Sequence, residues 1–327
     1  MVHQMPKVVS FQQPTIAIIT AQYCEKVAVD AMIENRDVYF RYKTEGESHV
    51  YTLGNIGSHR VVATKLPCVG HDRSAMIAAG NTTTRLLGTF QNVEYVFLVG
   101  VGGGVPHYTD YKKHVRLGDV VVSAPTEEHN YIYVYCEKKK ALGLQGTSSS
   151  GGYKVRTWAL PNYELQKYAQ LVWQQQSSNI LQWQNYIEEA QQLLLDQEAN
   201  FSRPSSESDK LFVSVEGENV IEVSHPEPPT GTEDLHTSIS PVVHFGVVGS
   251  GKMDDTERLE FAHQHGIKAF DSEFDAVAES LYGNRQDNYI FLRGISDYRD
   301  GTVDKEWQPY AALAAAAFMK AVINSLN

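Results

Sequence analysis

Three carboxylates each follow an apolar stretch of the chain. Glu25 comes after "PTIAIITA" (Pro14–Ala21), Glu273 comes after "KAFDS", and Asp297 ends "NYIFLRGISD". Short apolar runs rich in β-branched residues are typical of buried strands. A carboxyl buried at the end of a strand has a raised pKa, so it can exchange a proton with a bound ligand near neutral pH.

Glycines and small polar residues follow the same kind of apolar run. In open α/β sheets, ligands bind outside the carboxyl ends of the strands. The sequence therefore predicts a ligand site formed by several strand ends. Besides the three carboxylates, its expected members are Gly100, Val101, Gly102, Gly103 and Gly104 in "GVGGGV", together with Ser250, Gly251, Lys252, Asp271, Ser272, Arg293 and Ser296.

Taken alone, each member also has a simpler structural interpretation. Asp297 suits a helix cap or a turn. Glu25 suits the first turn of a helix, where the macrodipole favours an acid. The glycines of "GVGGGV" also suit turns, and their spacing is not that of the dinucleotide-binding motif. The hypothesis of a ligand site rests on the combination of these residues.

The elements that would position these residues alternate between strands and helices. Strands are expected at 14–21, 93–104, 117–125, 242–251 and 288–297, a hairpin at 49–67, and helices at 25–34, 74–87, 254–266 and 305–326. Continuous apolar strands alternating with helices favour an α/β fold whose sheet is largely parallel. We therefore expect one catalytic domain over residues 15–325 with a central, mostly parallel twisted sheet flanked by helices.

Residues 126–240 differ from the rest of the chain because they are polar and rich in Gln, Ser, Gly and Pro. This composition predicts a large insertion made of helix and loop, with an amphipathic helix near Leu181–Leu195. The stretch "FSRPSSESDK" (201–210) is interpreted as an exposed linker. The insertion could pack on the domain, act as a lid, form an oligomer contact or fold as a separate domain.

The bulk composition narrows the classes of protein. The 327 residues carry a net charge of −11, which disfavours non-specific binding to nucleic acid or to an anionic membrane. Three widely spaced cysteines indicate a reducing compartment, without a disulfide framework or a structural zinc site. Neither a signal peptide nor a membrane-spanning run is recognisable. We expect a cytoplasmic protein, with the nucleus as the alternative.

Several motifs together resemble the nucleoside phosphorylase/nucleosidase superfamily, which includes purine and uridine phosphorylases and methylthioadenosine/S-adenosylhomocysteine nucleosidase. They are "IAIITAQYCEKVA", "VFLVGVGGGVP", "RLGDVVVS", "HFGVVGSG", "AFDSE" and "LRGISDYRDGTVDKEWQPYAALAAAAFMKAV". The resemblance covers about residues 15–125 and 241–326. It is strongest to a subgroup fused to ankyrin or nucleotide-binding regulatory domains in fungi, and it implies a three-layer phosphorylase-type fold.

The resemblance implies roles for the three carboxylates. Asp297 would bind and protonate N7 of the leaving purine. This fits the chemistry, because cleavage of an N-glycosidic bond builds negative charge on the base. Glu273 would bind the 2′ and 3′ hydroxyls of the ribose, and Glu25 would position and activate the attacking water.

Further roles follow from the same resemblance. Ser250 to Met253, including Gly251 and Lys252, would line the base pocket, and Gly102 and Gly103 would let the backbone approach the sugar or the base. Arg293 would orient the acid that follows it.

Two departures from the family pattern alter the expected pocket. Relatives read "EMEA" where this chain reads "DSEF", so Ser272 replaces a methionine that packs on the ribose and Phe274 replaces an alanine. Val101 stands where several relatives have serine or threonine. These departures leave open a catalytically degenerate sensor that binds a nucleoside or nucleotide without turnover.

The arginines that phosphorylases use to clamp phosphate are missing. Leu98-Val99 and "AQYCEK" occupy the corresponding positions, which favours hydrolysis over phosphorolysis. Arg73, near the start of a predicted helix, could hold a phosphate group of the substrate at the helix N-terminus. The alternative is a solvated turn capped by Asp72.

We therefore predict a purine nucleosidase that hydrolyses the N-glycosidic bond of an adenine-type nucleoside or nucleotide, including AMP or ATP. A phosphorylase that uses phosphate instead of water is the second hypothesis, and the degenerate sensor is the third. No metal or other cofactor is expected, since the acids have separate organic roles and no His/Cys ligand cluster is recognisable. A homo-oligomer is expected, with a dimer first.

Overall fold

The computed structural model describes most of the chain with side chains. The described residues are 2–4, 12–42, 48–68, 70, 72–138, 153–175, 182–214, 220–230, 241–251, 253, 255–272, 274–298 and 305–326. Two predicted site residues, Lys252 and Glu273, lie outside this set. Among the described helices, none combines the length and the apolarity needed to cross a bilayer.

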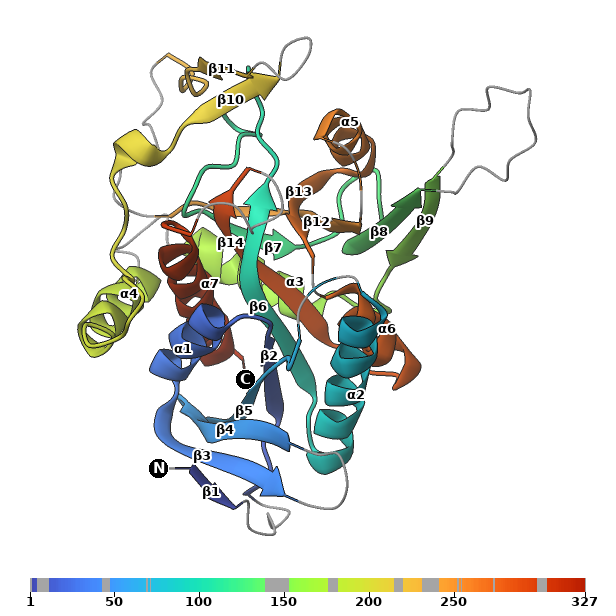
Figure 1. Cartoon of the computed structure of the whole chain (residues 1–327), viewed down its shortest axis with the longest axis vertical. Coiled ribbons are helices and arrows are strands. Elements are labelled where there is room, and N and C mark those ends of the chain that lie inside the picture. The colour runs from blue at the N-terminus through green and yellow to red at the C-terminus, as the bar shows by residue number, and fades with distance from the viewer. Residues whose placement is uncertain are drawn as a thin grey trace.

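Most strands form one large mixed sheet (Figure 1). In chain order its strands are β1 (Val2–Gln4), β2 (Ile16–Thr20), β3 (Glu34–Tyr42), β4 (Ser48–Ile56), β5 (His59–Lys65), β6 (Tyr95–Gly104), β7 (Val120–Ser123), β8 (Tyr133–Lys138), β9 (Tyr153–Trp158), β12 (Val243–Gly251), β13 (Ile267–Asp271) and β14 (Tyr289–Asp297). The spatial order is β1-β3-β4-β5-β2-β6-β14-β7-β12-β8-β9, and β13 pairs with both β12 and β6.

The centre of the sheet consists of parallel groups that meet at β14. Strands β5, β2, β6 and β14 are parallel neighbours, as are β7, β12 and β8, and β14 pairs antiparallel with β7. Because β13 pairs with β12 on one side and with β6 on the other, the strands β6-β14-β7-β12-β13 close into a ring. The expected mostly parallel central sheet is confirmed, and the ring brings distant strand ends to one place.

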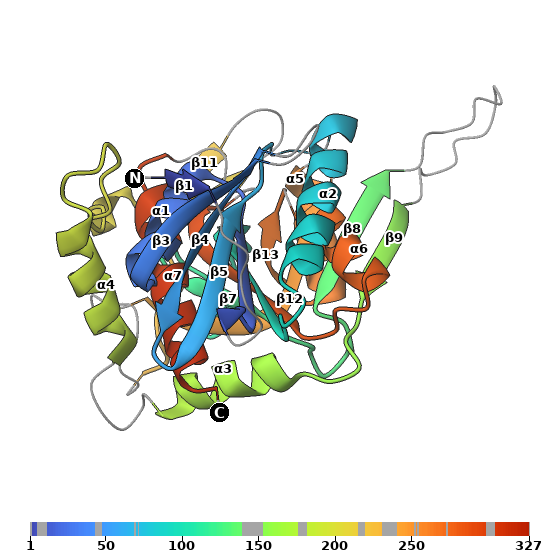
Figure 2. The same ribbon diagram turned by 90° about the horizontal axis from the view of Figure 1, so that it is seen from below.

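Helices cover both sides of the sheet, as expected for three layers (Figure 2). Figure 2 shows α1, α4 and α7 on one side of the strands and α2 and α6 on the other. Helix α7 is almost entirely buried because an alanine-rich run, Ala311–Ala317, lets it lie close to β14 and β6. The helices are α1 (Tyr23–Met32), α2 (Arg73–Thr89), α3 (Glu164–Gln175), α4 (Gln182–Leu193), α5 (Asp255–His265), α6 (Asp275–Gly283) and α7 (Gln308–Asn324), with a short 3₁₀ turn at Ser206–Ser208.

The segment 126–240 contains more strand than its composition predicted. It does include helices α3 and α4, and α4 confirms the amphipathic helix expected near Leu181–Leu195. It also supplies β8 and β9, which extend the main sheet, and a separate hairpin of β10 (Leu211–Ser214) and β11 (Val220–Val223). The expectation of helix and loop alone was wrong, because aromatic and β-branched runs such as "YIYVY" favour strands.

Candidate active site

The side chain of Glu25 is hydrogen-bonded both to the residues that follow β2 and to β6. It lies in the first turn of α1, and its Oε2 accepts hydrogen bonds from the backbone N–H groups of Ala21 and Gln22, each at 2.8 Å. Its Oε1 accepts a hydrogen bond from the N–H of Val101 at 2.9 Å. Strand β2 ends at Thr20 while β6 continues to Gly104, so the carboxylate takes the place that a neighbouring strand would occupy beside β6.

The surroundings of Glu25 make it an unusual helix-capping acid. It is buried, and burial raises the pKa of its carboxyl despite the opposing effects of the three N–H donors and of Arg293. A Cβ atom at Gly100 would lie 2.7 Å from its Oε1, so only glycine allows the carboxylate this close to β6. A buried carboxyl with a raised pKa is suited to exchanging a proton with a ligand.

Asp297 reaches the same segment of β6 from the opposite strand. Ile295 pairs with Gly102 and Asp297 with Gly103, and the register shifts between them, at Ser296. Val101, which contacts Glu25, and Gly103, which faces Asp297, are two residues apart along β6, or about 7 Å at the rise of a strand. The structure thus brings Glu25, Val101, Gly102, Gly103 and Asp297 together, as the sequence predicted.

Asp297 itself is buried at the end of β14. The hydroxyl of Ser296 donates a hydrogen bond to its Oδ2 at 3.2 Å. Asp297 is the last residue of β14 and its pairing with Gly103 follows an irregularity in the register, so contacts of the residues beside it also help to fix its position.

Arg293 is fully buried and is held by protein groups. Its Nη2 donates to Oδ2 of Asp271 at 3.0 Å, and its Nη1 donates to the carbonyl of Leu98 at 3.0 Å. Its guanidinium lies 4.3 Å from the ring centroid of Phe274. The predicted contact of Arg293 with a ligand stays a prediction; the contacts in the structure hold the strand ends of β6, β13 and β14 in place.

Asp271 was expected at the site and Phe274 was expected to alter the pocket, but the contacts of both with Arg293 were not predicted. Asp271 accepts a second buried hydrogen bond from the hydroxyl of Tyr133 at 2.7 Å, so it bridges β8, β13 and β14. Phe274 is buried beneath Arg293. The departure "DSEF" therefore has a structural reason, since its first and last residues form the surroundings of the arginine. The unusual sequence of this motif was the signal that could have revealed the pairing.

The end of β12 contributes Ser250 and Gly251. Ser250 is fully buried and pairs in register with Asp271 of β13. Gly251 has φ +127°, and a Cβ atom there would lie 2.0 Å from the carbonyl oxygen of Cys136, so no other residue fits. Met253 packs against the small apolar cluster that contains Phe261 and Phe270. These residues lie beside β13, and their predicted role in lining the base pocket stays a prediction.

The described residues contain no group of three or more His, Cys, Asp and Glu side chains that could hold a metal ion. Lys26 and Arg293, two basic side chains near the strand-end acids, bind other protein groups. Lys26, next to Glu25, donates to Asp30 and to Thr52 at 2.6 Å each. Arg293 is paired with Asp271.

Known proteins share this architecture. No protein-family model matches the chain. The futalosine hydrolase of Helicobacter pylori strain 26695 superposes with a TM-score of 0.55 at 16% identity, over 97% of this chain and 100% of that one. A 5′-methylthioadenosine/S-adenosylhomocysteine nucleosidase from Neisseria meningitidis gives 0.54 at 15% identity, over 96% and 100%. The chain has the nucleosidase fold.

The nucleosidase fold is also shared with a nucleosidase from Colwellia psychrerythraea 34H in complex with adenine, at a TM-score of 0.52 and 16% identity over 96% of both chains. By sequence, the chain is 28% identical over 328 residues to a nucleotide-binding leucine-rich repeat (NLR)-like protein of the fungus Hyaloscypha variabilis. The match covers 95% of this chain but 29% of the length of that relative. This agrees with the expected likeness to a fungal subgroup fused to regulatory domains.

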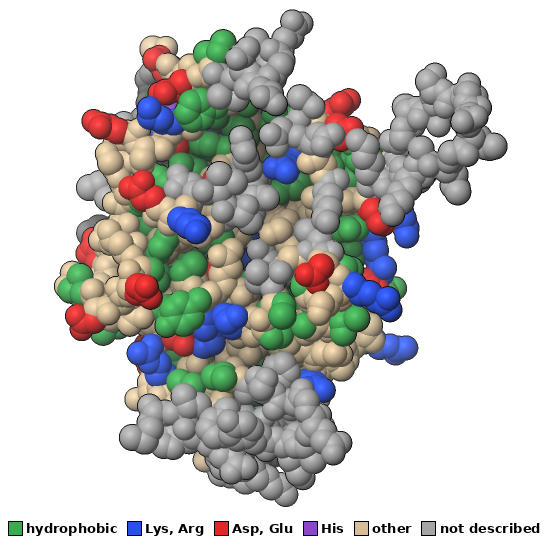
Figure 3. Space-filling model, in the orientation of Figure 1, with side chains coloured by type: hydrophobic (Ala, Val, Ile, Leu, Met, Phe, Trp, Pro, Cys, Tyr) green, Lys and Arg blue, Asp and Glu red, His purple; other side chains and the backbone are tan. Residues whose placement is uncertain are grey.

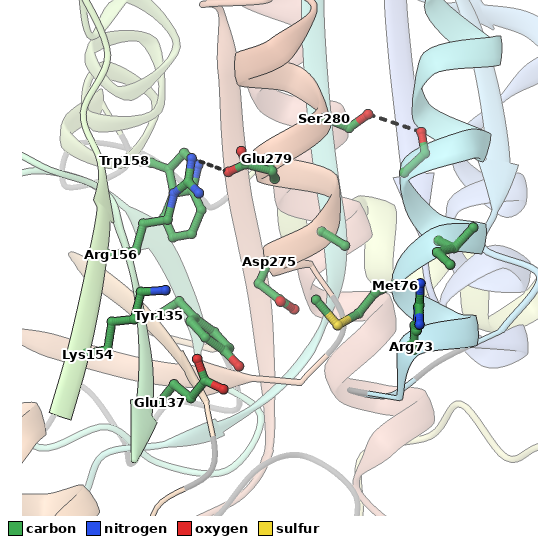
Figure 4. Close-up of a pocket in the computed structure, with 13 residues that line it drawn as sticks. Arg73, Met76, Tyr135, Glu137, Lys154, Arg156, Trp158, Asp275, Glu279 and Ser280 are labelled. Carbon is green, nitrogen blue, oxygen red and sulfur yellow. Dashed lines mark hydrogen bonds and ion pairs between the residues drawn. The ribbon is translucent and has the colours of Figure 1, made fainter. Parts of the chain in front are cut away.

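Within the nucleosidase fold, Arg73 lies apart from the strand-end residues. It is the exposed first residue of α2 and lines a pocket of about 690 Å³ between α2, α6 and the hairpin β8–β9. Figure 4 shows Tyr135, Lys154 and Arg156 on one wall, Met76 and Arg73 on the other, and Asp275 between them. Asp72 caps α2 by accepting from the N–H of Ala75 at 2.7 Å, as the alternative interpretation expected.

The charges around this pocket are mixed. Arg156 forms an ion pair of 2.5 Å with Glu279, and Lys154 faces Glu137 across the β8–β9 pair. On the right of Figure 3, where β8, β9 and α6 lie, hydrophobic and basic side chains stand side by side. Glu25, Ser250 and Asp297 are not among the described residues that line the pocket. The predicted phosphate contact of Arg73 stays a prediction.

Proposed function

We propose that the chain is a purine nucleosidase that hydrolyses the N-glycosidic bond of an adenine-type nucleoside or nucleotide. The observation that carries this proposal is the placement of two buried carboxylates, Glu25 and Asp297, on one short segment of β6. The solved structures with the same fold support it, because their names describe hydrolases of nucleosides and one of them contains adenine.

In the proposed reaction, Asp297 gives a proton to N7 of the purine while the bond between C1′ and the base nitrogen breaks. The electron pair of that bond leaves with the base. Water attacks C1′ from the other side of the sugar and passes a proton to Glu25, whose raised pKa suits it to accept one. The products are free base and ribose with a hydroxyl at C1′. Glu273 and Ser272 would hold the ribose, and Ser250 to Met253 would line the base.

Hydrolysis is favoured over phosphorolysis because the neighbouring Lys and Arg side chains already bind protein groups. A phosphate clamp needs uncommitted arginine or lysine donors beside the sugar. Lys26 is bound to Asp30 and Thr52, and Arg293 is bound to Asp271. Lys26 and Arg293 are therefore engaged by protein groups.

The test is a chromatographic assay of base release from adenosine, methylthioadenosine, inosine, AMP and ATP, each with and without phosphate. We expect free base without phosphate, and at least 10²-fold lower kcat for Asp297→Asn. Asp287→Asn, the same change at an exposed aspartate, is the matched control and should keep full activity. Base release only with phosphate would replace the proposal by a phosphorylase. Binding without release from any substrate would replace it by a sensor.

We also propose that the protein is cytoplasmic and forms a homo-oligomer, with a dimer first. The acidic balance and the unpaired cysteines support the first point. Exposed apolar side chains beside the α2–α6 pocket, Met76 and Ile77, support the second. Light scattering of the purified chain tests it, and a monomeric mass at micromolar concentration would contradict it.

A further inference from the structure

A residue of the segment 126–240 reaches the immediate neighbour of Asp297. Asp209, just before β10, is buried with both carboxylate oxygens engaged. Its Oδ1 accepts a hydrogen bond from the hydroxyl of Tyr298 at 2.6 Å, and its Oδ2 accepts one from Nε of Arg116 at 2.7 Å. Hydrogen bonds to a charged acceptor at such distances are among the stronger contacts in proteins.

The two hydrogen bonds of Asp209 link Tyr298, directly after β14, to Arg116 in the turn before β7. The turn 116–119 is bonded directly to β14, because the N–H of Gly118 donates to the carbonyl of Ile295 and the N–H of Ile295 donates to the carbonyl of Asp119, each at 2.8 Å. Tyr298, three residues further along, is attached to Arg116 of the same turn through Asp209. Residues 295–298 are thus fastened at both ends, and Asp297 lies between the two attachments.

These attachments act where the strand pairing comes to an end. The register of β14 against β6 is irregular between Ile295 and Asp297, and the pair Asp297–Gly103 is the last one of β14. Tyr298 lies beyond this last pair, so its bond to Asp209 supports Asp297 from the side that the sheet does not reach. Burial and the charge of Asp209 raise the pKa of Tyr298 well above its usual range, so its hydroxyl stays protonated and remains a donor.

Two histidines hold Asp209 in turn. The backbone N–H of His107 donates to Nδ1 of His114, which leaves Nε2 of His114 to donate to Nδ1 of His225 at 2.8 Å. Nε2 of His225 then donates to the carbonyl oxygen of Asp209 at 2.8 Å. An imidazole ring can offer one donor and one acceptor nitrogen, and this series of hydrogen bonds uses both nitrogens of His114 and of His225. The position of Asp209 is therefore set by the domain core and by the segment 126–240 together.

We propose that Asp209 is a positioning residue for the reaction: by holding Tyr298 against Arg116, it fixes the orientation of the general acid Asp297. The inference rests on the proposed nucleosidase function. The inference gives the segment 126–240 a part in catalysis without any movement of that segment. Asp209 would then do more than stabilise the β10–β11 hairpin.

The experiment compares Asp209→Ala, Asp209→Asn and Tyr298→Phe with the wild type in the base-release assay. Misplacing an acid by about 1 Å can cost 10²-fold, so we expect kcat to fall between about tenfold and 10²-fold in Asp209→Ala and about tenfold in Tyr298→Phe. KM should change less than kcat. The double variant should be no worse than Asp209→Ala alone, because both changes remove the same link. Asp209→Asn, which can still accept from Tyr298, should recover part of the loss.

The split between kcat and KM separates positioning from simple stabilisation. If Asp209 positions the acid, kcat should fall at saturating substrate in Asp209→Ala, while KM stays close to that of the wild type and urea unfolding still shows a folded protein. Glu222→Gln is the matched control, because it removes the exposed ion pair between Lys210 and Glu222 at 3.2 Å in the same hairpin. It should leave both kcat and KM unchanged.

The outcomes distinguish this inference from the proposed function. A wild type that releases no base overturns the proposed function and this inference with it. An active wild type whose Asp209→Ala and Tyr298→Phe variants keep kcat within about twofold overturns this inference alone. If Asp209→Ala does not fold, Tyr298→Phe decides, since it removes a single oxygen atom.

Discussion

Replacing Gly100 with alanine should displace the carboxylate of Glu25. The new Cβ would lie 2.7 Å from Oε1 and 3.1 Å from Oε2, whereas ordinary contact begins at 3.4 Å. Moving Oε1 by the missing distance, about 0.7 Å, would stretch its 2.9 Å hydrogen bond from Val101 beyond the usual range. The protein either loses this bond to a charged group, at about 1.5–3 kcal/mol, or accepts the overlap, at about 1–3 kcal/mol. We expect the free energy of unfolding to fall by about 2 kcal/mol.

Urea unfolding of Gly100→Ala, Glu25→Ala and the double variant measures this clash. Removing the Glu25 side chain removes the obstacle, so alanine at position 100 should cost far less in the Glu25→Ala background. Gly88→Ala is the control, because nothing lies within 4 Å of its Cβ position in helix α2. That change should stabilise the protein by about 0.5–1 kcal/mol. An equal cost of Gly100→Ala with and without the Glu25 side chain would refute the reasoning.

Three further predictions concern the same strand ends. Arg293→Met should lower the free energy of unfolding by about 3–5 kcal/mol, because it leaves the buried carboxylate of Asp271 without its cation; urea unfolding should show that adding Asp271→Asn recovers part of the loss. Burial raises the pKa of Glu25, so the native state binds its proton more tightly than the unfolded state, and the wild type loses stability as pH rises above the ordinary pKa of glutamate, about 4.3. The stability advantage of the wild type over Glu25→Gln should therefore shrink from pH 4.5 upward, whereas an advantage that grows with pH would contradict the assigned shift. Gly251→Ala should give little folded protein, because alanine meets both a φ of +127° and the carbonyl of Cys136; circular dichroism of the purified variant tests this, and a normal melting curve would show that the strand end can adjust.

The parts of the fold that could be predicted are those that a local run of apolar residues determines. Strands β2 and β14 are continuous buried runs; the charged residue Glu25 follows β2 within five residues, and Asp297 ends β14. Because the strand ends follow from these runs, Glu25 and Asp297 could be placed at one edge of the sheet. Strands β1 and β3 were not predicted, since their residues are largely polar and they form by pairing with a neighbour rather than by burial.

The contacts of Asp209 could not have been predicted from the sequence. The stretch 201–210 was interpreted as an exposed linker because it is rich in serine and charge, yet Phe201 and Asp209 are buried in it. Its position is fixed by hydrogen bonds to residues far away in the chain, such as the one that Nε1 of Trp307 donates to Ser208 at 3.0 Å. Such pairings leave no periodic pattern, so only the folded structure reveals them.

The ring of strands has a consequence for the order of synthesis. Strand β14 lies between β6 and β7, although it follows β7 by more than 160 residues in the chain. Until a ribosome has made β14, the two earlier strands lack their common partner and keep unpaired backbone edges. Long-range strand pairing of this kind is slow and exposes nascent chains to aggregation. Folding of the central sheet is therefore expected to finish only after most of the chain has left the ribosome, which makes this domain a natural client of chaperones that shield strand edges.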